Sequence, residues 1–205
     1  GGKVAYFDKI EWKVVPDAAT QAAALQTGEV DWVDLPIFDL IPQLRKNANI
    51  KVSVFDPLGW IAIVAINHLH PPFNNKKLRQ ALLMAVNQQD VIDAVLGEVK
   101  EFGATGAGFF TMNTPNASQA GMEKIMGPRN IEAAKKAVAE SGYKGEKIVL
   151  MSPSDLAALQ AIAQVTDAMY KSIGLNVEYT SLDWGSIITR RANKEPSDKG
   201  GWNNF

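Results

Sequence analysis

The chain has 205 residues, of which 46% are hydrophobic and 21% charged, and its formal net charge is −1. This balance is typical of a globular protein, and it provides no overall positive field that would attract a nucleic acid or an acidic membrane. There are no cysteines, which excludes disulfides, thiolate metal sites and cysteine nucleophiles. No run of eighteen apolar residues occurs, so no membrane-spanning helix is expected.

The first predicted elements are a strand, a helix and a second strand. Residues 8–16 (DKIEWKVVP) alternate between apolar and polar side chains, which predicts a half-buried strand with Trp12 in the core. Asp17 can cap the following alanine-rich helix and Gly28 can end it. Residues 29–36 (EVDWVDLP) then predict another strand, with Trp32 in the core.

The middle of the chain predicts a short helix, two strands and a longer helix. The short helix is expected within residues 38–47 (FDLIPQLRKN) and the first strand at residues 50–55 (IKVSVF). Residues 60–67 (WIAIVAIN) are almost wholly apolar, which is typical of a strand buried on both faces. Asn74 or Asn75 can then cap a helix that buries apolar positions such as Leu82.

The last third of the chain predicts a parallel pair of strands. Asn87 can begin one more helix, and a glycine-rich stretch of about thirty residues with little periodicity follows it. Residues 146–151 and 175–180 are predicted strands, joined by a long helix that Ser152 is expected to cap. A strand, a helix and a strand in this order favour parallel pairing. Asp183 can cap the helix that follows.

The motifs that could carry catalytic or metal chemistry are weak. His68 and His70 are the only histidines; they alternate at a strand end, and no carboxylate is close in sequence to complete a metal site. The stretch GATGAG at 103–108 lacks the strand before it and the helix after it that a dinucleotide-binding turn requires. We therefore expect no metal site and no cofactor. Nucleic-acid binding is not expected either, because the basic cluster at 76–79 has no stacking aromatics beside it.

Several aromatic side chains could line a cleft. Trp60, Trp184 and Trp202 lie at the edges of predicted elements, where an indole can bury its ring and still direct its N–H to a partner. Phe109 and Phe110 lie on the irregular stretch and either attach it to the core or present a face to a ligand. Attachment to the core is the interpretation that we expect for the two phenylalanines.

Four stretches, in this order, resemble family 5 of the extracellular solute-binding proteins. The first is YFDKIEWKVVPDAATQAAALQTGEVDWVDLP at 6–36, which contains an L-Q-x-G-E-V-D pattern. The second is AINHLHPPFNNKKLRQALLMAVNQQDVIDAVLG at 65–97, whose Pro-Phe, R-x-A and final glycine resemble the same family. The others are IEAAKKAVAESGYKG at 131–145 and IGLNVEYTSLDWGSIITRR at 173–191.

The resemblance implies the receptor of an ABC importer, with two lobes that close on a small solute and deliver it to permease subunits in the inner membrane. The implied fold class is α/β, a periplasmic-binding-protein-like lobe with a mixed sheet flanked by helices. Residues 1–36 would be the end of the first lobe, and residues 37–205 most of the second lobe, truncated at its C-terminus. We expect a periplasmic location, with the secretion signal missing from this fragment, and a monomer in the full-length form.

The resemblance also suggests where the solute lies. Peptide-binding members carry an aspartate in a G-W-x-x-D loop that holds the peptide amino group, whereas here Trp202 is followed by Asn203, Asn204 and Phe205. We expect Trp202 and Asn203 to approach a peptide-like solute, an opine or a similar molecule, with Arg190 or Arg191 nearby.

An arginine there could hold a solute carboxylate through two parallel hydrogen bonds. Arg191 is favoured because it lies four residues after Ile187, on the apolar side of the helix; the alternative is that both arginines are solvated. The predicted ligand-binding set is completed by aromatic residues, which are Trp184, Trp60, Phe109 and Phe110.

An enzyme is the alternative function. A small α/β hydrolase or transferase domain would need a nucleophile with a base, or a phosphate-binding loop. The sequence contains no G-x-S-x-G, no P-loop and no H-E-x-x-H motif, so we expect a binding protein and not an enzyme.

Overall fold

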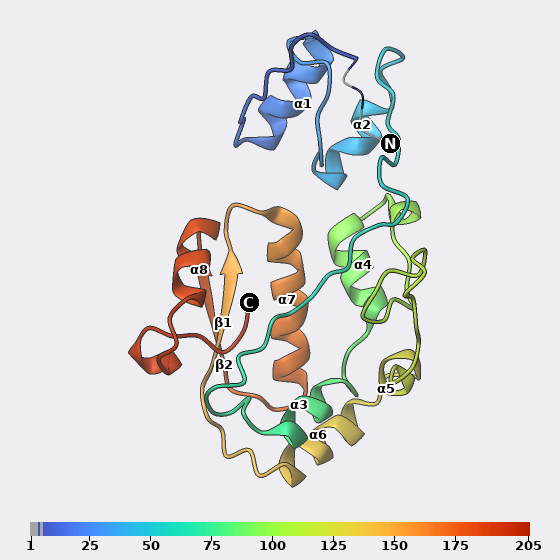
Figure 1. Cartoon of the computed structure of the whole chain (residues 1–205). Helices are drawn as coiled ribbons and strands as arrows, with labels where there is room; N and C mark the ends of the chain where they lie inside the picture. The colour runs from blue at the N-terminus through green and yellow to red at the C-terminus, as the bar shows by residue number, and fades with distance from the viewer. Residues whose placement is uncertain (1–3, 5) are drawn as a thin grey trace. The chain divides into compact units, whose positions relative to one another are not determined.

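The structure is a computed structural model that describes Val4 and residues 6–205 (Figure 1). The chain divides into two compact units, Gly1–Ser53 and Val54–Phe205. These units are defined by contacts within this chain. The predicted boundary between two lobes, after residue 36, stays a prediction.

The first unit is built around one capped helix. Helix α1 (Ala18–Thr27) begins after Asp17, whose carboxylate accepts a 2.7 Å hydrogen bond from the Thr20 N–H, and it ends at Gly28 with φ 75°. Both predicted ends of this helix are confirmed. The 3₁₀ turn η1 (Phe38–Leu40) and the short helix α2 (Ile41–Leu44) follow.

The two strands predicted in the first unit are wrong. The described part of residues 8–16 and 29–36 contains no strand. Trp12 is 83% exposed and Trp32 is 61% exposed, so neither side chain lies in a core. An alternating segment becomes a strand only where a neighbouring strand pairs with its backbone, and the described residues of this unit provide none.

The second unit contains a small mixed sheet. Strand β1 (Ile148–Pro153) pairs in parallel with β2 (Val177–Leu182), as predicted, with Ile148 opposite Val177. On its other edge β1 pairs with residues 203–205, where the Met151 N–H donates to the Asn204 carbonyl at 2.9 Å. Residues 65–67 run antiparallel to 203–205. The order across the sheet is therefore 65–67, 203–205, β1, β2.

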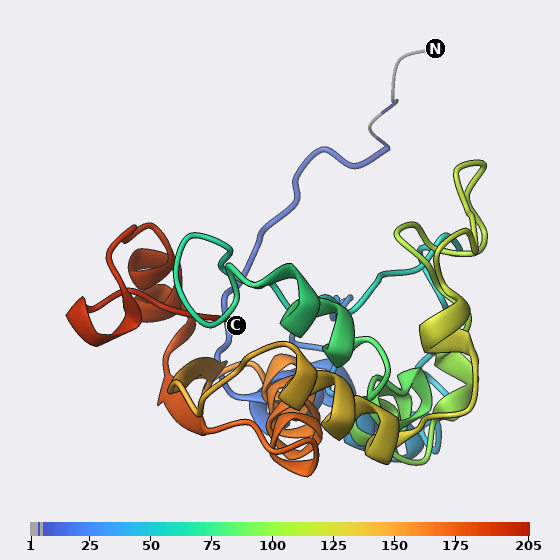
Figure 2. The same ribbon diagram turned by 90° about the horizontal axis from the view of Figure 1, so that it is seen from below.

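Helices cover both faces of this sheet (Figures 1 and 2). Side chains of α7 (Ala157–Ser172), α3 (Lys76–Leu82) and α6 (Ile131–Glu140) form the larger core with Ile148 of β1. On the opposite face, Val149 and Met151 pack against Ile187 of α8 (Trp184–Arg191). Alternate residues of β1 thus face different cores, as the pleat of a strand requires.

Three of the remaining elements lie between α3 and α6 along the chain. Helix α4 (Gln88–Leu96) packs against α7 and is followed by the 3₁₀ turn η2 (Lys100–Phe102) and the short helix α5 (Glu123–Met126). A last 3₁₀ turn, η3 (Ser197–Lys199), follows α8. No helix in the described residues is both long and apolar enough to cross a membrane.

In the second unit, three predicted helix caps are confirmed and one is wrong. Asn75, Asn87 and Asp183 each accept hydrogen bonds from backbone N–H groups of the helix that follows. Ser152 was expected to cap the long helix, but it lies fully buried within β1 and its hydroxyl accepts a 2.6 Å hydrogen bond from Tyr179. Parallel pairing continues to Pro153 opposite Leu182, so the strand extends over the expected cap.

The predicted strands at 50–55 and 60–67 form only in small part. Residues 65–67 pair with 203–205, and no other strand pairing is present within these two segments. Ile63 is 77% exposed, so the apolar run is not buried on both faces in the described structure. As in the first unit, the described residues lack the neighbouring strands that such burial needs.

Candidate functional site

Trp202 lies at the junction of α8 and the central strand segment 203–205. Its indole N–H donates to the Arg191 carbonyl at 2.9 Å, which ties the segment to the end of α8. Its ring meets the Phe205 ring edge to face, with centroids 5.1 Å apart and planes at 65°. Both rings are half-buried against the core that Val149 and Ile187 share.

Arg191 lies beside the same rings. The carbon at the centre of its guanidinium is 5.9 Å from the centroid of the Phe205 ring, within the range of a cation–π contact. Trp184, at the first position of α8, is half-buried against the same core from the other end of the helix. We call these four residues the Trp202 cluster: Trp184, Arg191, Trp202 and Phe205.

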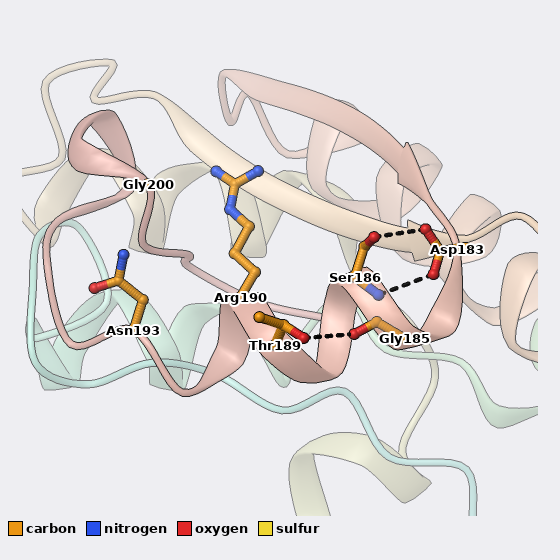
Figure 3. A pocket seen from close by; sticks show the side chains of 7 residues that line it. All are labelled: Asp183, Gly185, Ser186, Thr189, Arg190, Asn193 and Gly200. Atoms are coloured by element: carbon orange, nitrogen blue, oxygen red, sulfur yellow. Dashed lines mark hydrogen bonds between the residues drawn. The ribbon is translucent and has the colours of Figure 1, made fainter.

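Arg190 points elsewhere, as expected for consecutive residues about 100° apart on a helix. Its Nε donates to the Gly201 carbonyl at 2.9 Å, and its side chain lines an open hollow of about 650 Å³ along α8 (Figure 3). The other residues that line this hollow are Asp183, Gly185, Ser186, Thr189, Asn193 and Gly200. Arg190 is thus the only residue of the predicted ligand-binding set that lines it.

Asn203 is buried in the sheet, with 1% of its surface exposed. Its Oδ1 accepts from the Val149 N–H at 2.8 Å, and its Nδ2 donates to the Pro71 carbonyl at 3.2 Å. Both ends of the amide are therefore bonded to the protein's own backbone. In this arrangement the side chain holds the 202–205 segment in place.

Phe109 and Phe110 lie apart from the Trp202 cluster. The loop that carries both phenylalanines is on the opposite side of the second unit from residues 200–205 in both ribbon views (Figures 1 and 2). Phe109 is 87% exposed and meets Phe110 edge to face at 5.0 Å. The expected attachment of this loop to the core by its phenylalanines is therefore wrong. Trp60 is exposed as well.

A polar side chain holds this loop instead. Gln88, in the first turn of α4, donates through Nε2 to the Ala107 carbonyl at 2.6 Å and accepts at Oε1 from the Gly106 N–H at 2.5 Å. Asn113 donates to the Pro57 carbonyl at 2.9 Å, which joins the loop to the segment that carries Trp60. The loop is thus held by amide hydrogen bonds while its aromatic rings face outward.

The titratable groups near these sites have structural roles. Hydrogen bonds from the hydroxyl and the backbone N–H of Ser186 hold the pKa of Asp183 below its usual value, as expected for a helix cap. Burial raises the pKa of Tyr170 well above its usual range. The Nε2 of His70 lies 2.6 Å from the Lys194 carbonyl. In the part of the chain that the structure describes, no three histidine or acidic side chains are grouped as a metal would need.

Sequence analysis missed two features of this region. Phe205 was not among the predicted ligand-binding residues, although its ring contacts that of Trp202. Asn193 and Gly200 were not considered, because neither forms part of a periodic pattern. The Gly200–Gly201 pair before Trp202 was the available signal for a tight turn there.

Comparison with known proteins identifies one family over almost the whole chain. The family model described as "Bacterial extracellular solute-binding proteins, family 5 Middle" matches residues 1–203. A probable peptide ABC transporter periplasmic-binding protein of Sinorhizobium fredii, y4tO, is 37% identical over 208 residues, covering 100% of this chain and 39% of that protein. The glutathione-binding protein GsiB of Escherichia coli K12 is 27% identical over 198 residues, covering 94% of this chain and 36% of that protein.

Solved structures of solute-binding proteins are similar in fold to this chain. The substrate-binding protein CtaP of Listeria monocytogenes is similar with a TM-score of 0.73 and 22% identity, covering 94% of this chain and 38% of that one. AgaA of Agrobacterium tumefaciens R10, solved with agropinic acid, is similar with a TM-score of 0.69 and 21% identity, covering 87% of this chain and 35% of that one. The chain therefore spans less than two-fifths of the length of these relatives.

Proposed function

Because the chain belongs to family 5 of the bacterial extracellular solute-binding proteins, we propose that it is part of the receptor of an ABC importer. The observation that carries this proposal is the family match over residues 1–203. The receptor captures a small solute in the periplasm and presents it to permease subunits in the inner membrane. The family and its named relatives are solute-binding proteins and not enzymes, so the alternative of a small hydrolase or transferase domain is set aside.

The solute that we propose is a peptide or a peptide-like molecule. The relative with 37% identity is named as a probable peptide-binding protein, and a more distant one as glutathione-binding. We further propose that residues 1–36 are the end of one lobe and residues 37–205 most of the other, within a longer, monomeric receptor that carries its own secretion signal. The shares of 36–39% that the chain covers in its relatives support this arrangement.

The Trp202 cluster is our proposal for the part of the solute site in this chain. Parallel α/β sheets bind ligands outside the carboxyl ends of their strands, and residues 203–205 run parallel to β1 toward that edge of the sheet. The rings of Trp202 and Phe205 offer apolar surface for a side chain of the solute. Arg191 is exposed, and no described carboxylate pairs with it, so its guanidinium is available for a solute carboxylate.

Asn203 supports the proposed site from behind. Its two hydrogen bonds to the backbone fix the strand that presents Trp202 and Phe205, so its substitution would weaken solute binding by displacing those rings. Trp60, Phe109 and Phe110 form the alternative surface for the solute, because they too are exposed aromatics in the same unit.

Binding assays on the longer receptor test the proposed function. Di-, tri- and tetrapeptides and glutathione are titrated calorimetrically, and at least one is expected to bind with a Kd in the micromolar range or tighter. Import of that solute should be lost when the gene of the receptor or of its permease is deleted. A receptor that binds none of these solutes and whose deletion leaves peptide import unchanged would contradict the proposal.

Substitutions locate the site. Trp202→Ala and Arg191→Ala are expected to weaken binding at least tenfold, whereas Phe109→Ala leaves it within twofold. If Phe109→Ala weakens binding and both substitutions in the Trp202 cluster do not, the solute lies along Trp60 and the Phe109 loop instead.

A further inference from the structure

The hollow along α8 contains an arginine whose charge has no counterpart. Arg190 is half-buried and its Nε is fixed by the Gly201 carbonyl, yet among the described residues it pairs with no carboxylate. Arg129, by comparison, is paired with Asp90. Arg79 is also half-buried, donates to a backbone carbonyl and pairs with no described carboxylate, so what distinguishes Arg190 is that its side chain lines a hollow.

A second donor is oriented toward the same turn. The Oδ1 of Asn193 accepts from the Glu195 N–H at 2.9 Å, which fixes the orientation of the amide. Its Nδ2 would lie 3.4 Å from a Cβ on Gly200, and no described acceptor pairs with it. In Figure 3 the side chains of Arg190 and Asn193 extend into the hollow on the side of Gly200.

The turn that carries this arrangement is held by hydrogen bonds and by two glycines. Gly200 has φ 85°, a conformation that favours glycine. A Cβ on Gly201 would lie 1.7 Å from the Glu195 carbonyl oxygen, so no side chain fits there. The Gly201 N–H donates to the Pro196 carbonyl at 3.0 Å, and His70 holds the Lys194 carbonyl. The backbone between the two donors is therefore defined by contacts within the protein.

The acidic groups around the hollow do not neutralise these donors. Asp183 lines its other end, but its carboxylate is bonded to the N–H and hydroxyl of Ser186. Glu195 and Asp198 belong to the same turn, and both are exposed to solvent. The hollow thus offers a planar guanidinium fork and an amide N–H₂ group on one side, a combination suited to a planar anion with two oxygens.

We propose that this hollow is a carboxylate-binding site, separate from the Trp202 cluster, in which Arg190 holds both oxygens of a small organic acid and Asn193 donates to one of them. The two donors and the turn between them lie within residues 190–201, and the proposal does not depend on the proposed importer function. Its open shape admits the remainder of the acid along α8.

The test is a titration of the 205-residue chain with acetate, followed through the side-chain N–H resonances of Asn193 and Arg190. A saturable shift is expected with a Kd on the order of 1–10 mM, the range available to a very small ligand held by one charged group. Acetamide, which has the same shape without the charge, and sodium chloride at equal ionic strength should produce no saturable shift. A response to chloride equal to that to acetate would overturn the proposal.

Variants assign the binding to Arg190. Arg190→Gln should weaken acetate binding at least tenfold, and Arg190→Lys nearly as much, because lysine keeps the charge but loses the fork. Lys199→Gln removes one charge from the same turn and should leave the Kd within twofold. If Arg190→Gln does not fold, Asn193→Ala should weaken binding at least threefold. Binding within twofold of the wild type in Asn193→Ala or in a folded Arg190→Gln would overturn the proposal, as would an equal loss in Lys199→Gln.

Discussion

Asn203 illustrates how one buried polar side chain can hold a functional segment in place. Its amide joins three stretches that are far apart in sequence, namely its own segment, β1 through Val149 and the turn at Pro71. Asn203→Ala should therefore destabilise the protein by about 1–3 kcal/mol for each buried group left without a partner. Denaturation with urea measures the loss.

Asn74→Ala is the matched control for this substitution. Asn74 is exposed, so its replacement should change the stability by less than about 0.5 kcal/mol. Equal stabilities of the Asn203 and Asn74 variants would show that the bonds of Asn203 do not support the sheet.

Leu82 tests the assignment of the larger core. It is 3% exposed at the end of α3 and belongs to the cluster that joins α3, α6 and α7. Leu82→Ala should cost about 2–5 kcal/mol of stability, because it leaves a cavity in a packed interior. Leu159→Ala, at a position that is 37% exposed, should cost much less in the same urea titration. A loss below about 0.5 kcal/mol for Leu82→Ala would contradict its place in the core.

For single residues, the sequence predicted burial in the core better than it predicted hydrogen-bond partners. Leu82 was expected in the core and is there. Asn203 was expected at a solute, but its bonds to Val149 and Pro71 depend on segments that meet only in the folded sheet. A single sequence carries no signal for such long-range hydrogen bonds.

Helix α8 begins at a cap whose effect on stability depends on pH. Its cap, Asp183, has a lowered pKa in the folded protein because the charged carboxylate accepts hydrogen bonds from Ser186. The stabilisation is therefore complete above the unfolded-state pKa of about 3.9 and is lost as the pH falls through the lower folded-state value. Asp183→Ala should lower the melting temperature at pH 7, and the difference from wild type should shrink toward pH 3.

Asp183→Asn separates the charge from the cap. Asparagine caps helices about as well as aspartate but does not titrate, so this variant should stay close to wild type at pH 7. Thermal melts of the three proteins between pH 3 and 7 measure the effect. A deficit in Asp183→Ala that is constant over this range would contradict the assigned role of the carboxylate.

Elements were predictable from sequence where their signals are local. The caps at Asn75, Asn87 and Asp183 each bond within their own first turn, and all three were found. Strands depend on neighbours, so the alternating residues 8–16 and 50–55 could not be judged from their own pattern. The predicted helix cap at Ser152 is wrong for the same reason, because pairing with β2 extends the strand past this residue.

The two hydrophobic core clusters found among the described residues both lie within the second compact unit of the chain. We therefore expect residues 54–205 to fold without the first unit and to melt cooperatively, with a melting temperature close to that of the 205-residue chain. Near-ultraviolet circular dichroism of both proteins during heating measures this. A gradual transition, or the absence of a fixed aromatic signal in residues 54–205, would show that their core needs the first unit.

The place of residues 203–205 in the middle of the sheet has a consequence during folding. Asn67, at the end of their antiparallel partner segment, lies 135 residues before Trp202 in the chain. Residues 65–67 therefore emerge, from the ribosome or from a translocation channel, well before the strand that pairs with them. Until that strand follows, an apolar stretch that includes Ile63 and Ile66 has an open edge, the condition in which incomplete chains associate with one another. A chaperone that shields residues 60–67 during this interval would therefore raise the yield of folded protein.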